Sequence, residues 1–269
     1  MKNCMKIGFI GAGNMGGALA IAAAKAVGGE NLLIADLDTP KAAALATSIG
    51  AAVADGATVA ATCNLIFLGV KPQVMETALT ALAPTLTARE DRPVLVSMAA
   101  GLTVACIKQW GGGLPTIRIM PNTPVAVGEG MTLFTVCRDV TPEQKALFER
   151  CMAASGHLSE LPESLIDAGC AVSGCGPAFA YLFIEALAAG GVEKGLASDV
   201  ALEYAARTVV GAAQMVLQTG RDPIALKDAV CSPGGATLQG VYALDRGGFR
   251  DVTISAVDAA YNRTLEMKK

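Results

Sequence analysis

Paired cysteines, histidine and aromatic residues are all scarce in this chain of 269 residues. The eight cysteines form no CxxC pair and the single histidine is His157, so a structural zinc site has little support. Scattered thiols without a pairing pattern are typical of proteins that stay reduced, which predicts a cytoplasmic location.

Basic and aromatic residues are too few for a nucleic-acid surface. Aromatic residues make up 4% of the chain, and 24 acidic against 21 basic side chains leave a net charge of −3. Without a basic stripe for phosphates or rings that stack on bases, both usual means of binding nucleic acid are missing. We therefore exclude nucleic acid as a partner.

Uncharged apolar stretches of membrane-spanning length are missing as well. The two longest candidates, near residues 15–29 and 178–192, contain Lys25 and Glu185. Glycine-rich strand sequence begins within the first ten residues, which leaves no room for the apolar region of a signal peptide. We expect a soluble protein without a membrane partner.

Apolar residues, by contrast, are abundant. They make up 52% of the chain against 17% charged residues, with a mean hydropathy of +0.47. Such values are high for a soluble monomer, and buried contacts between subunits are one explanation.

Short apolar runs alternate with helical segments through the first 160 residues, which predicts a parallel sheet. The runs are IGFI at 7–10, LLIA at 32–35, LIFLGV at 65–70, VLVSM at 94–98, IRIM at 117–120 and MTLFTV at 131–136. A helix beginning near Thr141, with Glu143 and Gln144 in its first turn, would complete this layer.

Helical spacing of Ala, Leu and Val replaces the strand pattern after Pro162. The expected helices are 164–172, 177–194, 198–219, 223–230, 233–246 and 249–267. We therefore predict an α/β fold: a Rossmann-type, doubly wound sheet domain at 1–162, followed by an all-helical domain at 163–269.

A glycine fingerprint lies between the first predicted strand and its helix. Gly11, Gly13 and Gly16 have the GxGxxG spacing, in which the glycines allow a tight turn, the approach of a pyrophosphate and close helix packing. Asn14 and Met15 fall inside it, at the predicted helix start. This context favours dinucleotide binding over a turn that only needs flexibility.

An acidic residue, Asp36, ends the second predicted strand, twenty residues beyond Gly16. A carboxylate there accepts both ribose hydroxyls of the adenosine half and repels a 2'-phosphate, which favours NADH over NADPH. Lys41 lies close enough in sequence to offset that repulsion. The alternative is an exposed turn residue beside Asp38.

GVKPQ at 69–73 follows the strand predicted at 65–70. Because open parallel sheets bind ligands at the carboxyl ends of their strands, we expect cofactor contacts there. The residues concerned are Val70, Lys71 and Pro72.

KDAVCSPGGATLQG at 227–240 has the features of a helix start that binds an anion. Ser232 can cap the first turn, and Pro233 suits the first helical position because no N–H is needed there. The two glycines that follow let a ligand approach the backbone. Unpaired N–H groups at a helix start attract a carboxylate or a phosphate.

Five stretches together resemble pyrroline-5-carboxylate reductase over nearly the whole chain. They are FIGAGNMG at 9–16, LVSMAAGLT at 95–103, RIMPNTPVAVGEG at 118–130, AVSGCGPAFAYLFIEALAAGGVEKGL at 171–196 and LKDAVCSPGGAT at 226–237. The resemblance implies reduction of the C=N bond of 1-pyrroline-5-carboxylate with hydride from NADPH or NADH. The product is L-proline, in the last step of its biosynthesis.

The same resemblance implies roles for individual residues. The substrate carboxylate would bind N–H groups around Ser232, Gly234 and Gly235, beside Ala236, and the Thr237 hydroxyl would meet the ring nitrogen. Contacts near the cofactor would come from Ala99, Ala100, Pro121 and Asn122, and Ser173 would flank the substrate. The alternatives are a helix-surface role for Thr237, a rigid turn at 121–122 and a helix cap at Ser173.

Several positions depart from the family pattern. Cys175, Phe179 and Ala236 stand where the family commonly has Ser, Tyr and Thr. Arg221 and Asp222 stand where an acidic residue and His are frequent. These changes put single polar contacts in doubt, and leave open whether Cys175 is reactive or an inert buried thiol. His157 is expected at the surface or in a helix cap.

Family members pair through interlocking helical domains, which implies a homodimer and allows a larger ring of dimers. The resemblance also implies a site between the sheet domain of one subunit and the helices of its partner. One rival is a reductase of the 3-hydroxyacid dehydrogenase type, which needs a lysine acid that Lys194 or Lys227 would supply. Another is a dinucleotide sensor without turnover.

Overall fold

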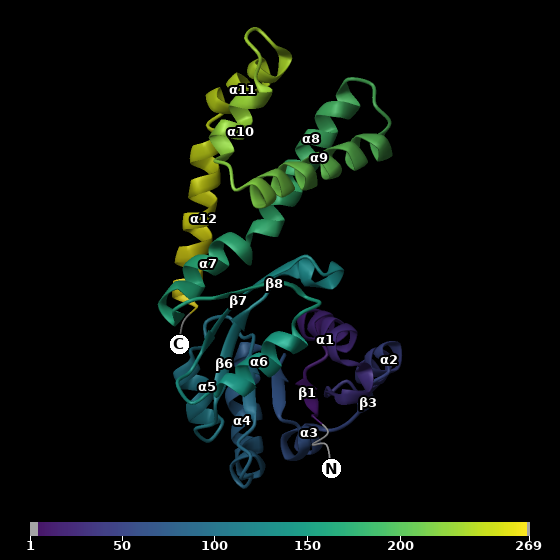
Figure 1. Cartoon of the computed structure of the whole chain (residues 1–269), viewed down its shortest axis with the longest axis vertical. Helices are drawn as coiled ribbons and strands as arrows, with labels where there is room; N and C mark the ends of the chain where they lie inside the picture. The colour runs from purple at the N-terminus through teal and green to yellow at the C-terminus, as the bar shows by residue number, and fades with distance from the viewer. Residues whose placement is uncertain (1–4, 268–269) are drawn as a thin grey trace. The chain divides into compact units, whose positions relative to one another are not determined.

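The computed structural model describes residues 5–267, which divide by packing into two compact units (Figure 1). The first, termed the sheet unit, ends at Cys175 and takes in the chain again from Ala260. The second, the helical unit, is Gly176–Ala259. The domain boundary predicted after residue 162 marks where strand sequence ends and stays a prediction.

Eight strands of the described chain form one sheet. They are β1 (Ile7–Ile10), β2 (Leu32–Ala35), β3 (Ala52–Val53), β4 (Leu65–Leu68), β5 (Val94–Ser97), β6 (Thr116–Met120), β7 (Gly130–Val136) and β8 (Gly156–Glu160). Their order is β3-β2-β1-β4-β5-β6-β7-β8, and all neighbours are parallel except β6 and β7. The strand order reverses at β1, as in doubly wound sheets, so the predicted fold class is confirmed.

Helices cover both faces of this sheet, so its central strands are apolar on both sides. In β4 the alternating side chains of Leu65 and Ile66 enter two different cores. The helices of the sheet unit are α1 (Asn14–Val27), α2 (Thr39–Ile49), α3 (Gly56–Thr62), α4 (Pro72–Thr87), α5 (Val104–Trp110), α6 (Pro142–Cys151) and α7 (Ile166–Ser173). Short 3₁₀ turns are η1 (Gly29–Asn31), η2 (Thr123–Val127) and η3 (Glu163–Leu165).

Aromatic rings from distant segments join one of these cores. Phe9 and Phe67 stack with ring centroids 4.5 Å apart, and Phe148 of α6 lies 5.2 Å from Phe134 of β7. Each buried phenylalanine contributes about 1.5–3 kcal/mol by removal from water. α6 thereby packs against the sheet where the glycine fingerprint begins.

The start of α6 confirms the helix predicted to begin near Thr141. Thr141 precedes the helix and accepts a hydrogen bond from the Gln144 N–H at 3.3 Å, while the Gln144 side chain accepts from the Thr141 N–H at 3.0 Å. This reciprocal capping satisfies N–H groups that the first turn leaves unpaired.

The two edge strands and the antiparallel pair were not predicted. β3 has only two residues, and β8, GHLSE, lacks an apolar alternation. β7 runs antiparallel to β6 because only the η2 segment joins them, which leaves no room for a parallel crossover helix. His157 lies exposed in β8, so the expected surface position is confirmed and the helix-cap alternative is not.

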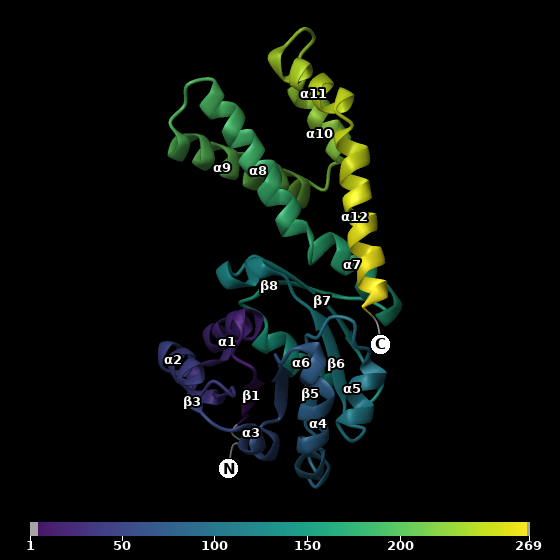
Figure 2. The same ribbon diagram turned by 180° about the vertical axis from the view of Figure 1, so that it is seen from behind.

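Five helices build the helical unit (Figure 2). They are α8 (Gly176–Glu193), α9 (Ser198–Thr219), α10 (Pro223–Val230), α11 (Ala236–Arg246) and α12 (Phe249–Glu266), the last of which continues beyond the unit. α8 and α9 pack through a small cluster of Ala188, Ala201 and Ala205 with Ile184. The predicted helices at 198–219 and 223–230 are confirmed.

Large apolar side chains of the helical unit remain exposed in the single chain. They include Leu182, Leu202, Val210, Leu217, Val252 and Ile254. The stretch Glu163–Glu193 is long and apolar enough to cross a membrane by length and composition, and its most apolar part is almost entirely unburied in the single chain. The apolar stretch near 178–192, which contains Glu185, lies within it. Because this finding depends on length and composition alone, the expected lack of a membrane partner stays a prediction. The exposed apolar surface agrees with the excess of hydrophobic composition.

Two cysteines of the sheet unit are expected to resist thiol reagents. Cys63 and Cys151 are fully buried, and desolvation raises the pKa of Cys63 to about 11 and that of Cys151 to about 12. At pH 8 their thiolate fractions fall roughly a hundredfold or more below that of a free thiol, because each pKa unit is a factor of ten. Alkylation of the folded protein followed by peptide mass mapping should leave both unmodified. Alkylation in denaturant should modify both, and rapid labelling of either in the folded protein would contradict the described burial.

Candidate functional site

The first and third fingerprint glycines are required by packing within the sheet unit. Gly11 has φ +106°, and a side chain there would lie 2.6 Å from the carbonyl carbon of Gly69. A side chain on Gly16 would come within 2.2 Å of the Gly11 carbonyl oxygen. Both substitutions therefore collide with backbone, which has little freedom to move.

The middle glycine, Gly13, is different. It has an ordinary φ of −66° as the N-cap of α1, and a side chain there would meet nothing within 4 Å. No side chain caps this helix, so the first N–H groups of α1 remain free for a ligand. The space beside Gly13 and these N–H groups suit a pyrophosphate.

Asp36 lies beside this loop and is held by two backbone groups. Its Oδ2 accepts a hydrogen bond from the Ala12 N–H at 2.6 Å and its Oδ1 accepts from the Asp38 N–H at 2.9 Å. The half-buried carboxylate is therefore fixed next to the glycine turn, and each oxygen keeps a lone pair for a ribose hydroxyl.

One cavity of about 460 Å³ brings many of the predicted cofactor residues together. It is lined by Gly11, Gly13, Asp36, Val70 and Lys71, along with Lys41, Asp55 and apolar neighbours. Four predicted residues of the adjoining helix starts do not line it, namely Asn14, Met15, Gly16 and Pro72. Its walls combine an anion-binding loop, the acidic groups of Asp36 and Asp55, and two lysines, and the loop, Asp36 and the lysines fit the adenosine and phosphate parts of a dinucleotide.

The loop after β6 is held rigidly by Asn122. Its side-chain Nδ2 donates to the Ser173 carbonyl at 2.9 Å, and its Oδ1 accepts from the Met131 N–H at 2.8 Å. Asn122 is only 8% exposed. These contacts support the rigid-turn alternative, and a direct contact of Asn122 or Pro121 with the cofactor stays a prediction.

The remaining predicted residues of the sheet unit sit in two other segments. Ala99 is buried and Ala100 is exposed in the loop between β5 and α5. Ser173 is the last residue of α7, and its hydroxyl donates to the Gly169 carbonyl at 3.0 Å. It therefore does not cap the following helix. Cys175 lies half-buried in the turn between α7 and α8.

Arg118 is almost fully buried in β6 and is not among the residues predicted for the site. Its guanidinium nitrogen Nη2 is 2.8 Å from Asp167 Oδ1, and Nη1 is 3.4 Å from Glu163 Oε1. The signal was present, since an arginine interrupts the apolar run IRIM. Its partners, however, lie more than forty residues away along the chain.

In the helical unit, SPGG forms a turn ahead of α11. The Gly235 N–H donates to the Ser232 carbonyl at 2.9 Å, and Gly234 has φ +72° after Pro233, as in a type II turn. The helix begins at Ala236 with Gly235 as N-cap and without a capping side chain.

This geometry corrects two expectations. Ser232 does not cap the helix, and Pro233 is not its first residue, because the type II turn precedes the first helical turn. Of the predicted donors, the Gly235 N–H is already used in the turn. The unpaired groups are instead the first N–H groups of α11, which begin at Ala236 and Thr237.

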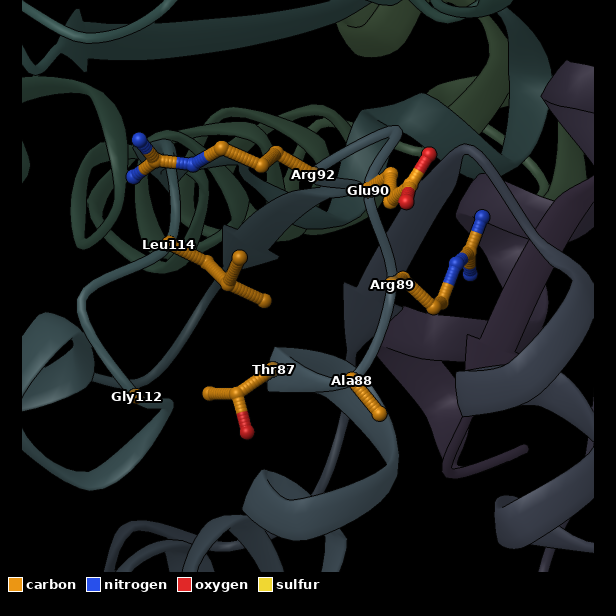
Figure 3. A pocket seen from close by; sticks show the side chains of 7 residues that line it. All are labelled: Thr87, Ala88, Arg89, Glu90, Arg92, Gly112 and Leu114. Atoms are coloured by element: carbon orange, nitrogen blue, oxygen red, sulfur yellow. The ribbon is translucent and has the colours of Figure 1, made fainter.

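A second cavity of the sheet unit, about 380 Å³, contains none of the predicted residues. It lies between the end of α4 and the loops before β5 and β6, and is lined by Thr87, Ala88, Arg89, Glu90, Arg92, Gly112 and Leu114 (Figure 3). The Arg89 guanidinium is occupied by Asp91 and two backbone carbonyls, and Arg92 donates to the Gly113 carbonyl. Because both arginines bond within the protein, the lining of this second cavity does not indicate any class of ligand.

Two family models match the chain. Residues 163–267 match the pyrroline-5-carboxylate reductase dimerisation model, and residues 6–101 match a model described as NADP oxidoreductase coenzyme F420-dependent. The two matches fall on the helical half and on the strands and helices around the glycine fingerprint.

Full-length relatives carry the same family name. A pyrroline-5-carboxylate reductase of Pisum sativum is 39% identical over 269 residues, which cover 99% of this chain and 97% of that protein. The solved structure of a pyrroline-5-carboxylate reductase from Coxiella burnetii matches with a TM-score of 0.90 and 31% identity, covering 99% of each chain. The Plasmodium falciparum pyrroline carboxylate reductase, solved with NADP bound, has a TM-score of 0.87 and 30% identity over 98% of each chain.

Proposed function

Because the chain belongs to the pyrroline-5-carboxylate reductase family, we propose that it reduces the C=N bond of 1-pyrroline-5-carboxylate to give L-proline. The protein is an NAD(P)-dependent oxidoreductase that forms homo-oligomers. The observation that carries the proposed reaction is the uncapped start of α11 behind the SPGG turn, which offers backbone N–H groups to a substrate carboxylate.

The residues of the sheet unit fit a dinucleotide. The phosphates would lie beside Gly13 at the start of α1, and the adenosine ribose would meet Asp36. The bound cofactor supplies the hydride. The chain's contribution is to hold the cofactor and the substrate in the orientation for transfer.

In the helical unit, the first N–H groups of α11 would bind the substrate carboxylate, and the Thr237 hydroxyl would hydrogen-bond the ring nitrogen. A protonated imine already attracts hydride to its carbon, so no covalent activation is needed. The ring nitrogen is bonded directly to the carbon that receives hydride, and its other ring neighbour carries the carboxylate. A fixed carboxylate and a fixed nitrogen together therefore orient the reacting carbon.

Direct assay tests the proposed reaction. Purified protein incubated with 1-pyrroline-5-carboxylate and either NADH or NADPH should lower the absorbance of the reduced cofactor and form proline. Binding of dinucleotide without turnover would instead support the sensor alternative. Turnover of 3-hydroxy acids alone would support the dehydrogenase alternative.

Lys227 offers little to the dehydrogenase alternative. Lys227 lies 2.9 Å from Asp228, whose hydrogen bond and charge raise the Lys227 pKa. The fully protonated, paired amine is a poor proton donor near neutral pH.

We further propose that the chain prefers NADH. The Asp36 carboxylate, held by the Ala12 and Asp38 N–H groups, would face the adenosine ribose, where its charge would repel a 2'-phosphate. Lys41 lines the same cavity and offsets part of this repulsion.

Replacing Asp36 with serine tests the cofactor preference. The ratio of kcat/KM for NADPH over that for NADH should rise by about tenfold or more, because a tenfold change needs only about 1.4 kcal/mol of relieved repulsion. Asp38→Asn is the matched control, since it removes a nearby charge and keeps an oxygen for the Lys41 N–H. An unchanged ratio in Asp36→Ser would show that Asp36 does not discriminate between a ribose with a 2'-hydroxyl and one with a 2'-phosphate.

The oligomer is proposed to be a homodimer formed through the helical unit, with a larger ring of such dimers as a further level. The exposed apolar side chains of α9 and α12 support this, because pairing would remove them from water. We also propose a cytoplasmic location, which suits the seven described cysteines, all of them free thiols.

A further inference from the structure

Arg118 lies where three segments of the sheet unit meet. It belongs to β6, two residues before the strand ends at Met120, and its side chain is 1% exposed. A guanidinium so fully removed from water is costly unless charged partners compensate it. Its partners come from α7 and from the turn that precedes α7.

The first contact joins β6 to α7. Arg118 Nη2 lies 2.8 Å from Asp167 Oδ1, and the Asp167 side chain is only 2% exposed. An ion pair between two buried groups is sensitive to geometry, because neither partner has water as a substitute. This pair therefore sets how the first turn of α7 lies against β6.

The second contact reaches the loop between β5 and α5. Arg118 Nη1 is 3.4 Å from Glu163 Oε1, and the same oxygen accepts a hydrogen bond from the Val104 N–H at 2.7 Å. Val104 is the first residue of α5 and follows the loop that carries Ala99 and Ala100. The carboxylate thus ties this loop to the arginine.

The far end of α7 is tied to the loop after β6. The Ser173 carbonyl accepts from the Asn122 side chain at 2.9 Å, and Asn122 in turn accepts from the Met131 N–H. α7 is therefore held near both ends, by Arg118 at Asp167 and by Asn122 at Ser173. A shift of α7 at the ion pair would be passed to the loop that carries Pro121 and Asn122.

We propose that Arg118 is a positioning residue that, through Asp167 and Glu163, fixes the two loops on the nicotinamide side of the cofactor site. The inference rests on the proposed function, because it takes Ala99, Ala100, Pro121 and Asn122 as that side. Arg118 itself, with its side chain 1% exposed, offers no surface to a cofactor or a substrate. Its loss leaves the adenosine side, around Gly13 and Asp36, in place.

Two variants separate positioning from folding. Arg118→Lys keeps the buried charge and loses the fork that reaches both carboxylates. Arg118→Met with Asp167→Leu removes both charges together, which often preserves stability where removal of one partner does not. Arg89→Met is the matched control. Arg89 is a largely buried arginine of the same unit, and it lines the second cavity instead of the cofactor site.

The measurements are the dissociation constants of NADH and of ADP-ribose, the thermal midpoint, and kcat and KM. In both Arg118 variants ADP-ribose should bind as in the wild type, while the advantage of NADH over ADP-ribose should shrink. kcat should fall by about ten- to a hundredfold, since misplacement of about 1 Å costs up to roughly a hundredfold. Arg89→Met should lower the thermal midpoint without changing the NADH advantage.

Some outcomes would overturn the inference. Folded Arg118 variants with an unchanged NADH advantage and unchanged kcat would show that Arg118 only stabilises the unit, and so would equal losses of ADP-ribose and NADH binding. If both variants fail to fold, Glu163→Gln, at a half-buried position, takes their place with the same readouts. The binding comparison needs no substrate, so it remains decisive even if pyrroline-5-carboxylate is not reduced.

Discussion

Replacement of Thr237 by alanine is expected to lower kcat by roughly ten- to a thousandfold, the range for loss of a hydrogen bond or proton-transfer partner at the reacting group. Thr237 is exposed at the second position of α11, next to the uncapped helix start. In the described chain its hydroxyl has no hydrogen-bond partner within the protein, so it is available to the ring nitrogen of the substrate.

Thr237→Ala should alter the reaction without altering the fold. Removal of an exposed hydroxyl leaves no cavity and no unpaired buried group, so the thermal midpoint and the dissociation constant of NADH should stay unchanged. Thr237→Ser is the matched control, because it keeps the hydroxyl and should retain most of the activity. Wild-type turnover in Thr237→Ala would remove Thr237 from the mechanism.

Replacement of Gly13 by alanine is expected to weaken dinucleotide binding by about five- to a hundredfold while the protein still folds. The added methyl group meets nothing within 4 Å in the protein, so its only collision is with a ligand that approaches the loop. Forcing one methyl group into a filled contact costs about 1–3 kcal/mol. Loss of glycine at the N-cap of α1 lowers the free energy of unfolding by about 1 kcal/mol or less.

Gly16→Ala provides the contrast to Gly13→Ala. A methyl group on Gly16 collides with the Gly11 carbonyl oxygen at 2.2 Å, so this variant should lose both thermal stability and cofactor affinity. Isothermal titration with NADH, together with thermal unfolding of each variant, distinguishes the two effects. If Gly13→Ala binds NADH with wild-type affinity, the pyrophosphate does not lie beside Gly13.

The start of α11 shows how far local sequence signals reach. SPGG correctly indicates a turn followed by a helix, and proline and glycine at its centre suit a type II turn. The same residues also suit a Ser-capped helix with proline in its first position, which is the conformation predicted from the sequence. Both conformations satisfy local rules. In the structure the Gly235 N–H donates to the Ser232 carbonyl, which closes the turn before the helix begins.

Asn122 shows a second limit. Its residue type and its place after a strand predict a polar group near the cofactor, but they do not reveal which atoms it bonds. The structure engages both its carbonyl and its amide with Met131 and Ser173. The partners come from β7 and α7, whose distances from Asn122 along the chain carry no periodic signal.

The sequence by itself determined the alternation of strands and helices, the glycine fingerprint with its acidic partner, and the presence of a turn and a helix at SPGG. Each of these depends on residues close together in the chain, where backbone geometry and periodicity decide the outcome. Only the tertiary structure decided the antiparallel β6–β7 pair, the edge strands and the partners of Arg118. A buried ion pair is favourable only at one mutual geometry of distant elements, and that geometry exists only after the sheet and its helices have packed.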